Sequence, residues 1–307
     1  MLNIQQGAVA RGTDFVCLIY GESGIGKTHF ALGATNPLYL NCEKGAKRVE
    51  LRNLTTVDTM NVLQFEDLLQ ITTEDIAPYT TLIIDTLGAV ITKAQDYVMR
   101  LKKKATFTIQ DWGTLRTYVV NVMEKFIDTG KNVIIIAHEE VEQSKMGKEE
   151  GKVVPMAQGS AINVIETRCD IIGHMYRDKN LNRILDICGT SAAKTKNCFK
   201  FSKDIIIPEQ GEGQLNTTFK KIIEDRVTAY RAEEQRQAPI FNELLETFKA
   251  KINAISTPEH CTMILKEINE TEDVLNIRAR AKQLLHKRSI ELGCVYDGVE
   301  QIFKKGE

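Results

Sequence analysis

The chain has 307 residues, 43% of them hydrophobic and 26% charged, and its formal net charge at pH 7 is -1. This length and composition allow a full hydrophobic core, and the near-zero charge excludes binding of nucleic acid through overall positive charge, so any such site must be a local patch. Seven scattered cysteines with no CxxC pair argue against a zinc site and favour free thiols in a reducing cytosol. The chain lacks an apolar run of 18 residues and a signal-peptide core, so we expect a soluble intracellular protein without membrane contact.

The N-terminal part of the chain contains a phosphate-binding motif. An apolar run at residues 15–20 predicts a strand, which leads into GESGIGKT at residues 21–28 and then a helical pattern. This sequence fits GxxxxGK[ST] at every fixed position, and the flanking strand and helix disfavour a glycine-rich turn of no function. Glycines allow consecutive N–H groups to surround a phosphate, and the helix adds its positive dipole end. We therefore predict nucleoside triphosphate binding by Gly21, Glu22, Ser23, Gly24, Ile25, Gly26, Lys27, Thr28 and His29.

Two further predicted strands end in carboxylates. Residues 37–43 form a buried run that ends in Glu43, and residues 80–86 form one that contains Asp85. In a parallel α/β sheet the strand C-termini form the ligand face. Glu43 could there polarise a water that attacks the γ-phosphate, or it could be a solvated loop residue. Asp85 fits a Walker B carboxylate, which together with Thr28 would hold Mg²⁺.

The middle of the chain predicts helices, a fourth core strand and lysine-bearing loops. A short strand at 55–57 and a polar helix near 61–72 precede helices at 87–101 and 115–126. Lys102, Lys103 and Lys104 follow the first of these two helices, where a lysine run is usually a solvated helix end. The strand 132–138 ends in His138, which is either a γ-phosphate sensor or a strand cap. A charged loop that reaches about residue 156 follows, and we expect it to be mobile.

After this loop we expect a helix at 160–168 and strand-like runs at 169–176, 182–188 and 200–207. Lys194 and Lys196 point the same way on an extended segment, where they are either solvated or able to reach the nucleotide of a neighbouring subunit. From about residue 231 the pattern is helical alone. Helices are predicted to begin at Pro239, at Pro258 after a Thr257 cap, and after a Thr271 cap. The last helix is basic and suits DNA, an acidic partner or plain solvent.

The order of these motifs resembles the core of the RecA superfamily, and the chain looks most like small bacteriophage RecA-like proteins. The resemblance implies an α/β fold: a RecA-like P-loop NTPase core with a mostly parallel central sheet flanked by helices, here residues 1–230, plus a C-terminal helical extension at 231–307. It implies that Glu43 activates the hydrolytic water and that His138 is the polar sensor. The segment AKTKNCF at 193–199 is similar to the KNRFG signature of RadA, whose basic residues act on the next subunit's ATP. Lys194 and Lys196 would take that role, although Thr195, Lys196 and Cys198 depart from the signature.

The resemblance also implies a function. It places DNA-binding loops at residues 101–110 and 139–157, which assigns DNA contacts to Lys102, Lys103, Lys104, Lys145 and Lys148. We expect a DNA-stimulated ATPase that uses ATP and Mg²⁺ and acts on single-stranded DNA in phage recombination, annealing or replication. Its expected partners are single-stranded DNA, copies of itself in a ring or filament, and a single-strand-binding or replication protein. The expected location is the cytoplasm of a bacterial host.

A function of another class remains open. The chain could be a nucleotide-switched adaptor, similar to a helicase loader, that grips a protein partner through its C-terminal helices. A small-molecule kinase is disfavoured because the sequence contains no lid-like arginine cluster.

Overall fold

A computed structural model gives the structure of the protein and describes residues 7–8, 12–43, 55–142, 151–157, 160–189, 192–202, 204–209 and 214–306. The chain divides into two compact units: residues 13–228 form one, and residues 229–307 with the N-terminal residues 1–12 form the other. Ala8 joins the second unit because its backbone N–H donates to Oδ1 of Asn242 at 2.8 Å and its carbonyl accepts from Nδ2 at 3.0 Å.

The larger unit is built on a mostly parallel sheet with the strand order β10-β8-β7-β1-β5-β4-β2-β3. Strands β7, β1, β5, β4, β2 and β3 are parallel to their neighbours, whereas β8, β10 and the side strands β6 and β9 pair antiparallel. The strands are β1 Val16–Gly21, β2 Pro37–Asn41, β3 Asp58–Asn61, β4 Thr81–Asp85, β5 Asn132–Glu142, β6 Lys152–Pro155, β7 Ile171–Arg177, β8 Arg183–Asp186, β9 Lys196–Asn197 and β10 Ile205–Ile207.

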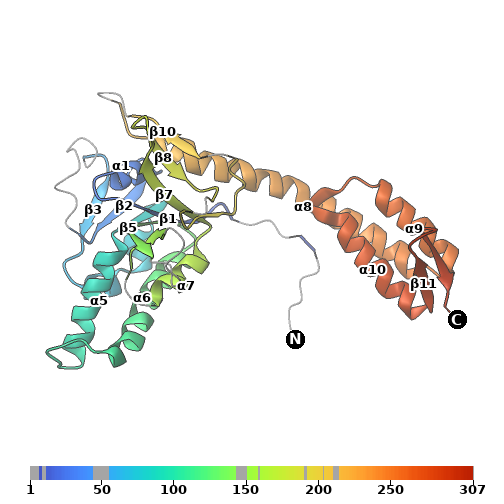
Figure 1. The fold of residues 1–307 in the computed structure, drawn as a ribbon, viewed down its shortest axis with the longest axis horizontal. Helices are drawn as coiled ribbons and strands as arrows, with labels where there is room; N and C mark the ends of the chain where they lie inside the picture. The colour runs from blue at the N-terminus through green and yellow to red at the C-terminus, as the bar shows by residue number, and fades with distance from the viewer. Residues whose placement is uncertain are drawn as a thin grey trace. The chain divides into compact units, whose positions relative to one another are not determined.

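Helices cover the sheet because the central strands are buried on both sides and read as continuous apolar runs. Helices α5, α6 and α7 lie together on one face (Figure 1), where their apolar residues share a core with Leu18 and Ile135. The helical segments of this unit are α1 Lys27–Ala31, α3 Phe65–Gln70, α4 Thr73–Ile76, α5 Leu87–Leu101, η2 Ile109–Asp111, α6 Trp112–Ile127, α7 Ala161–Arg168 and the π-helical turn η3 Lys220–Glu224.

The register of the parallel strands brings their C-terminal ends to one edge of the sheet. Gly21 pairs with His138, and Asn41 pairs with Asp85. The backbone N–H groups of Cys42 and Glu43 both donate to the carbonyl oxygen of Asp85, at 2.8 and 3.1 Å. The chain that leaves β2 is therefore held directly beside the end of β4.

The predicted fold class is confirmed: an α/β protein with a mostly parallel central sheet, flanking helices and C-terminal helices. Three local predictions in this unit were wrong. The strand expected at 55–57 lies instead at Asp58–Asn61, and the helix expected near 61–72 is two short helices, α3 and α4. Strand β5 does not end at His138, because it continues to Glu142 and pairs there with β6.

The smaller unit contains α9 Pro258–Glu270, the short turn η4 Val274–Asn276, α10 Ile277–Glu291 and most of α8 Asp225–Asn253. Pro239 does not begin a helix, since it lies inside the 29-residue helix α8. Thr257 caps α9 as predicted, because its side chain accepts the N–H of His260. Thr271, however, is the C-cap of α9, and α10 begins only at Ile277.

The prediction that the C-terminal region is helical alone was also wrong. Strands β11 Cys294–Asp297 and β12 Ile302–Lys305 form an antiparallel hairpin that packs on α9 and α10. Their inward residues Cys294 and Phe303 complete a core of twelve buried residues that belongs to this unit. Among the residues described, no helix has both the length and the apolar character needed to cross a membrane.

Candidate nucleotide site

The loop between β1 and α1 has the backbone of a phosphate cradle. Gly24 and Gly26 have φ angles of 82° and 104°, in the region that favours glycine. Gly21 is required for a second reason, because a Cβ atom there would lie only 2.2 Å from the carbonyl oxygen of Met175. The loop thus turns tightly against β7 and exposes Glu22, Ser23 and Gly24, the positions whose N–H groups would face a phosphate.

Lys27 is folded into this loop. Its side chain is buried, and Nζ donates to the carbonyl oxygens of Gly21 and Glu22 at 2.8 and 2.7 Å. Burial lowers the pKa of Lys27, and the nearby carboxylates of Asp85 and Glu139 partly offset that change. The ammonium group therefore lies at the phosphate cradle with acceptors that phosphate oxygens could replace.

Thr28 and Asp85 meet at the sheet edge. The Thr28 hydroxyl donates to Oδ2 of Asp85 at 2.7 Å, and the hydroxyl of Tyr39 donates to the same oxygen at 2.8 Å. Asp85 is 3% exposed, and this burial raises the pKa of its carboxyl group, whereas the two hydroxyl donors oppose that shift. Tyr39 was missed by sequence reasoning. A tyrosine in a fully buried strand was its one signal, since a buried phenol normally finds a hydrogen-bond partner.

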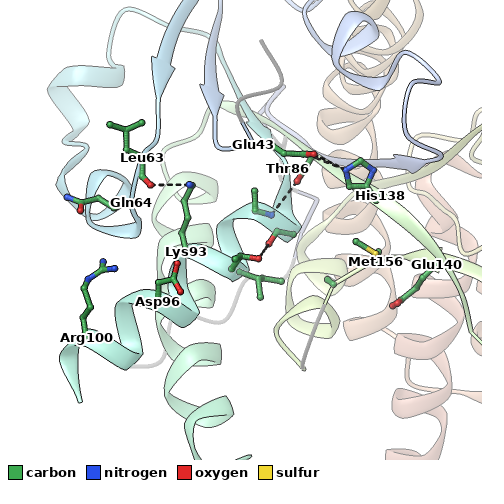
Figure 2. Close-up of a pocket in the computed structure, with 15 residues that line it drawn as sticks. Glu43, Leu63, Gln64, Thr86, Lys93, Asp96, Arg100, His138, Glu140 and Met156 are labelled. Carbon is green, nitrogen blue, oxygen red and sulfur yellow. Dashed lines mark hydrogen bonds and ion pairs between the residues drawn. The ribbon is translucent and has the colours of Figure 1, made fainter. Parts of the chain in front are cut away.

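Glu43 and His138 face each other beside these residues. The Nε2 atom of His138 lies 3.3 Å from Oε2 and 3.4 Å from Oε1 of Glu43, and each side chain is about one-quarter exposed. Figure 2 shows the pair at one end of a pocket of about 520 Å³, with Thr86 next to it and Arg100 at the far end. The structure thus brings together Glu43, Asp85 and His138, while their catalytic roles stay predictions.

The residue after His138 makes a second histidine–carboxylate contact. Because neighbouring residues of a strand point to opposite faces, Glu139 turns away from Glu43. Its Oε2 lies 2.7 Å from Nε2 of His174, whose ring stacks on Tyr20 at a centroid distance of 5.0 Å. Sequence reasoning missed this pair because β5 and β7 become neighbours of β1 only in the folded sheet.

Lys194 and Lys196 both reach the C-terminal end of α7. Nζ of Lys194 lies 2.5 Å from Oε2 of Glu166, and Nζ of Lys196 donates to the carbonyl of Thr167 at 3.1 Å. Tyr20 fixes the segment, because its hydroxyl accepts the N–H of Lys194 and donates to the carbonyl of the same residue. The two lysines thus share one side of the segment, as their spacing predicts, and each has a contact within its own chain.

The predicted DNA-contacting lysines have different surroundings. Lys102 and Lys104 bond to Oδ1 of Asp111 at 2.8 and 3.0 Å, and this carboxylate also caps the turn at Thr108. Lys103 is exposed and has a φ of 51°. Lys145 and Lys148 lie outside the described residues. Among those of the five lysines that the structure describes, Lys103 is therefore the one that is exposed to solvent and has no ion pair with another described residue.

Comparison with known protein families settles the class of this site. The family described as an AAA domain matches residues 13–199, which is more than half of the chain and includes the loop, Glu43, Asp85 and His138. The chain belongs to the AAA domain family. A P-loop ATPase of this family binds a nucleotide and typically Mg²⁺.

The residues present fit a magnesium ion. The Thr28 hydroxyl and the Asp85 carboxylate supply hard oxygen donors, and they already lie within 2.7 Å of each other at the phosphate cradle of this AAA domain. A cation there would also hold the buried carboxyl group of Asp85 in its ionised form. Groups of three His, Cys, Asp or Glu side chains that could hold another metal do not occur among the described residues.

Solved structures give only distant similarities to this AAA protein. A KaiC-like protein from the hyperthermophilic archaeon Pyrococcus horikoshii OT3 is 12% identical, with a TM-score of 0.36 over 62% of this chain and 83% of that chain. The flagellar accessory protein FlaH from Methanocaldococcus jannaschii is also 12% identical, with a TM-score of 0.35 over 63% of this chain and 84% of that chain. Comparison with curated proteins gives no match.

Proposed function

We propose that this AAA protein hydrolyses ATP with Glu43 as the residue that orients water, and that it acts on single-stranded DNA in recombination, annealing or replication. The observation that carries the proposal is the contact between Glu43 and His138 at the end of the sheet where Thr28 and Asp85 also meet. Through this contact, Glu43, a carboxylate suited to water activation, is connected to strand β5, which continues past His138 and pairs with β6 at the surface.

In the proposed reaction, water attacks the γ-phosphorus in line with the bond to the leaving ADP. Glu43 accepts a hydrogen bond from this water and orients it, and Lys27 leaves its backbone acceptors to contact the outer phosphates. Thr28 and Asp85 would hold a Mg²⁺ ion, which would supply positive charge to neutralise the phosphates. His138 holds the Glu43 carboxylate in place, since its imidazole lies within reach of both carboxylate oxygens.

Strand β5 supports a link from this site to a binding surface. It continues beyond His138 to Glu142 and pairs there with β6, whose Pro155 lies opposite Glu139. A change at His138 would thus reach the hairpin through one continuous strand. On the same proposal, the exposed Lys103 contributes a contact to the DNA backbone, because phosphate contacts dominate binding that does not depend on base sequence.

The proposed assembly is a ring or filament of identical chains. Lys194 and Lys196 lie on a short surface segment after β8 and would then leave their contacts on α7 to reach the ATP of a neighbour. A mixture of Lys194→Ala and Glu43→Gln chains tests this role, because trans action predicts recovered turnover in the mixture. Purely additive rates would limit these lysines to a structural contact.

The test of the proposed function is ATP hydrolysis by the full chain with and without single-stranded DNA, at two salt concentrations. Lys27→Ala is the blank for contaminating ATPases. Salt-sensitive stimulation that is absent from the blank is the expected result, since backbone contacts release counterions. Hydrolysis that is indifferent to DNA would overturn the DNA part of the proposal and leave the ATPase part intact.

The smaller unit favours one second candidate, the nucleotide-switched adaptor. It has its own core and exposes apolar side chains on and beside its hairpin, among them Val295 at 60% and Val299 at 94% exposure. Exposed apolar side chains suit a protein partner better than they suit a nucleic acid. An adaptor would show nucleotide-dependent partner binding that Val295→Asp abolishes, with ATP hydrolysis unchanged by DNA.

A further inference from the structure

Arg183 packs against the phosphate-binding loop from a strand that the sequence did not connect with it. It is the first residue of β8, it is half-buried, and its backbone lies between Arg177 of β7 and Ile207 of β10. A Cβ atom added to Gly26 would lie 2.9 Å from Nη1 and 3.7 Å from Cδ of Arg183. The guanidinium group therefore lies next to the loop, on the side of Gly26 from which a side chain would project.

The charge of Arg183 has no counterpart in the described part of the chain. No hydrogen bond or ion pair to its guanidinium group occurs there, although the side chain is half-buried. The residue directly opposite is a second arginine, Arg177, whose Nη1 donates to the carbonyl of Leu181 in the hairpin turn. Like charges at directly opposed positions of an antiparallel pair repel each other, so this arrangement costs free energy unless an anion lies nearby.

The group that would supply this anion is the nucleotide. The loop of residues 21–28 holds phosphate through its backbone, and Lys27 already shows that cations gather at it. A guanidinium group suits phosphate because it is planar, always charged and able to give two parallel hydrogen bonds. Arg183 also belongs to the same chain as the loop, in contrast to the lysines proposed to act between subunits.

We propose that Arg183 is a nucleotide-binding residue that contacts the phosphates held by the loop of its own chain. The inference rests on the proposed binding of ATP and adds Arg183 to the residues that bind it. It assigns the recognition of the phosphate chain to two cations from different elements, Lys27 from α1 and Arg183 from β8. The neighbouring Arg177 lines a pocket with Glu22 and Ser23 of the loop, and its Nη1 donates to the carbonyl oxygen of Leu181 in the hairpin turn.

The test is the affinity of full-length Arg183→Ala, Arg183→Lys and the control Arg116→Ala, on the exposed side of α6, for ATP, ADP and adenosine, measured by displacement of a fluorescent ATP analogue. Arg183→Ala is expected to weaken ATP and ADP about ten- to a hundredfold, as the loss of a hydrogen bond to a charged group does, and to leave adenosine unchanged. Arg183→Lys is expected to recover part of the loss. Arg116→Ala is expected to bind as the wild type does.

Several results would overturn the inference. Unchanged ATP affinity in Arg183→Ala would do so, as would an equal loss for adenosine or an equal loss in the control Arg116→Ala. The thermal unfolding midpoint without nucleotide checks that each variant is folded. If Arg183→Ala does not fold, the affinity of Arg183→Lys is used in its place. Failure of the wild type to bind ATP would overturn the proposed function together with this inference, whereas normal wild-type binding with an indifferent Arg183→Ala overturns the inference alone.

Discussion

His138 and Glu43 come from strands that are not neighbours in the sheet, yet the Nε2 atom of one lies 3.3 Å from a carboxylate oxygen of the other. Strand β4 lies between them and ends in Asp85, whose carbonyl accepts the N–H of Glu43. The backbone hydrogen bond thus fixes the position of the Glu43 main chain, and the contact with His138 fixes the position of its carboxylate. A residue that acts in this way is a positioning residue.

Replacement of His138 therefore changes turnover more than binding. His138→Ala is expected to lower kcat about tenfold with little change in KM, since one positioning hydrogen bond is lost. His138→Gln, which keeps a donor near the carboxylate, is expected to recover part of the rate. Steady-state kinetics of both variants check this, and equal rates for His138→Ala and the wild type would remove the residue from the site.

Asp85→Asn is expected to stabilise the protein in the absence of nucleotide. Burial raises the pKa of Asp85, so the folded state favours its neutral form. The stability that this group contributes is present below the pKa of an unfolded aspartate, about 4, and is lost as the pH rises through the folded pKa. At pH 7 the neutral side chain of the Asp85→Asn variant avoids the cost of burying a charged carboxylate. Its amide oxygen can still accept hydrogen bonds from the hydroxyls of Thr28 and Tyr39. Thermal unfolding should give a higher midpoint for Asp85→Asn at pH 7 but not at pH 4, and hydrolysis should be abolished.

Asp111 should show the opposite pH dependence. Hydrogen bonds from Lys102 and Thr108 lower the pKa of its carboxyl group. The resulting stability is present above about pH 4 and is lost as the pH falls through the folded pKa. Asp111→Asn is therefore expected to lower the unfolding midpoint at pH 7, with a smaller difference from the wild type at pH 3. An equal difference at both pH values would mean that the ionised carboxylate is not what holds the turn.

Within the described part of the chain, Lys103 can be replaced without loss of an ion pair, whereas Lys102 and Lys104 are both bonded to Asp111. A Lys103 variant therefore tests DNA binding without a change in stability. Lys103→Asn suits the positive φ of 51°, so the unfolding midpoint should not change. Affinity for single-stranded DNA should fall, and the slope of log K against log salt should become shallower by about 0.7. The exposed Lys179, in the turn between β7 and β8, provides the control variant Lys179→Ala. Identical salt slopes for Lys103→Asn and the wild type would remove this loop from the DNA surface.

Local patterns were sufficient for much of the site. The strand–loop–helix around Lys27 and the buried runs that end near Glu43, Asp85 and His138 are readable because each motif is continuous in sequence. Parallel pairing then places the strand ends at one edge, which is why these side chains meet. Contacts that depend on which strands become neighbours could not be read this way, and the pairs Glu139–His174 and Gly26–Arg183 are of that kind.

The errors in the C-terminal region have two physical causes. Pro239 lies within α8 although proline normally ends or begins a helix, and no local signal predicts that tertiary packing will override it. The hairpin of β11 and β12, by contrast, had a local signal. Asp297-Gly298 is a strong turn dipeptide between two short runs that contain β-branched and aromatic residues, and it was read as part of a helical region.

The most direct test of the account is the comparison of Glu43→Gln with the wild type in ATP binding and in turnover. Glutamine has nearly the same shape and keeps a contact with His138, but it cannot orient water as a carboxylate does. The expected result is an unchanged Kd for ATP with kcat lower by about a hundredfold or more. Glu140→Gln, which changes a carboxylate elsewhere on the rim of the same pocket, is the matched control. Wild-type turnover in Glu43→Gln would contradict the account, because the residue at its centre would then have no part in the chemistry.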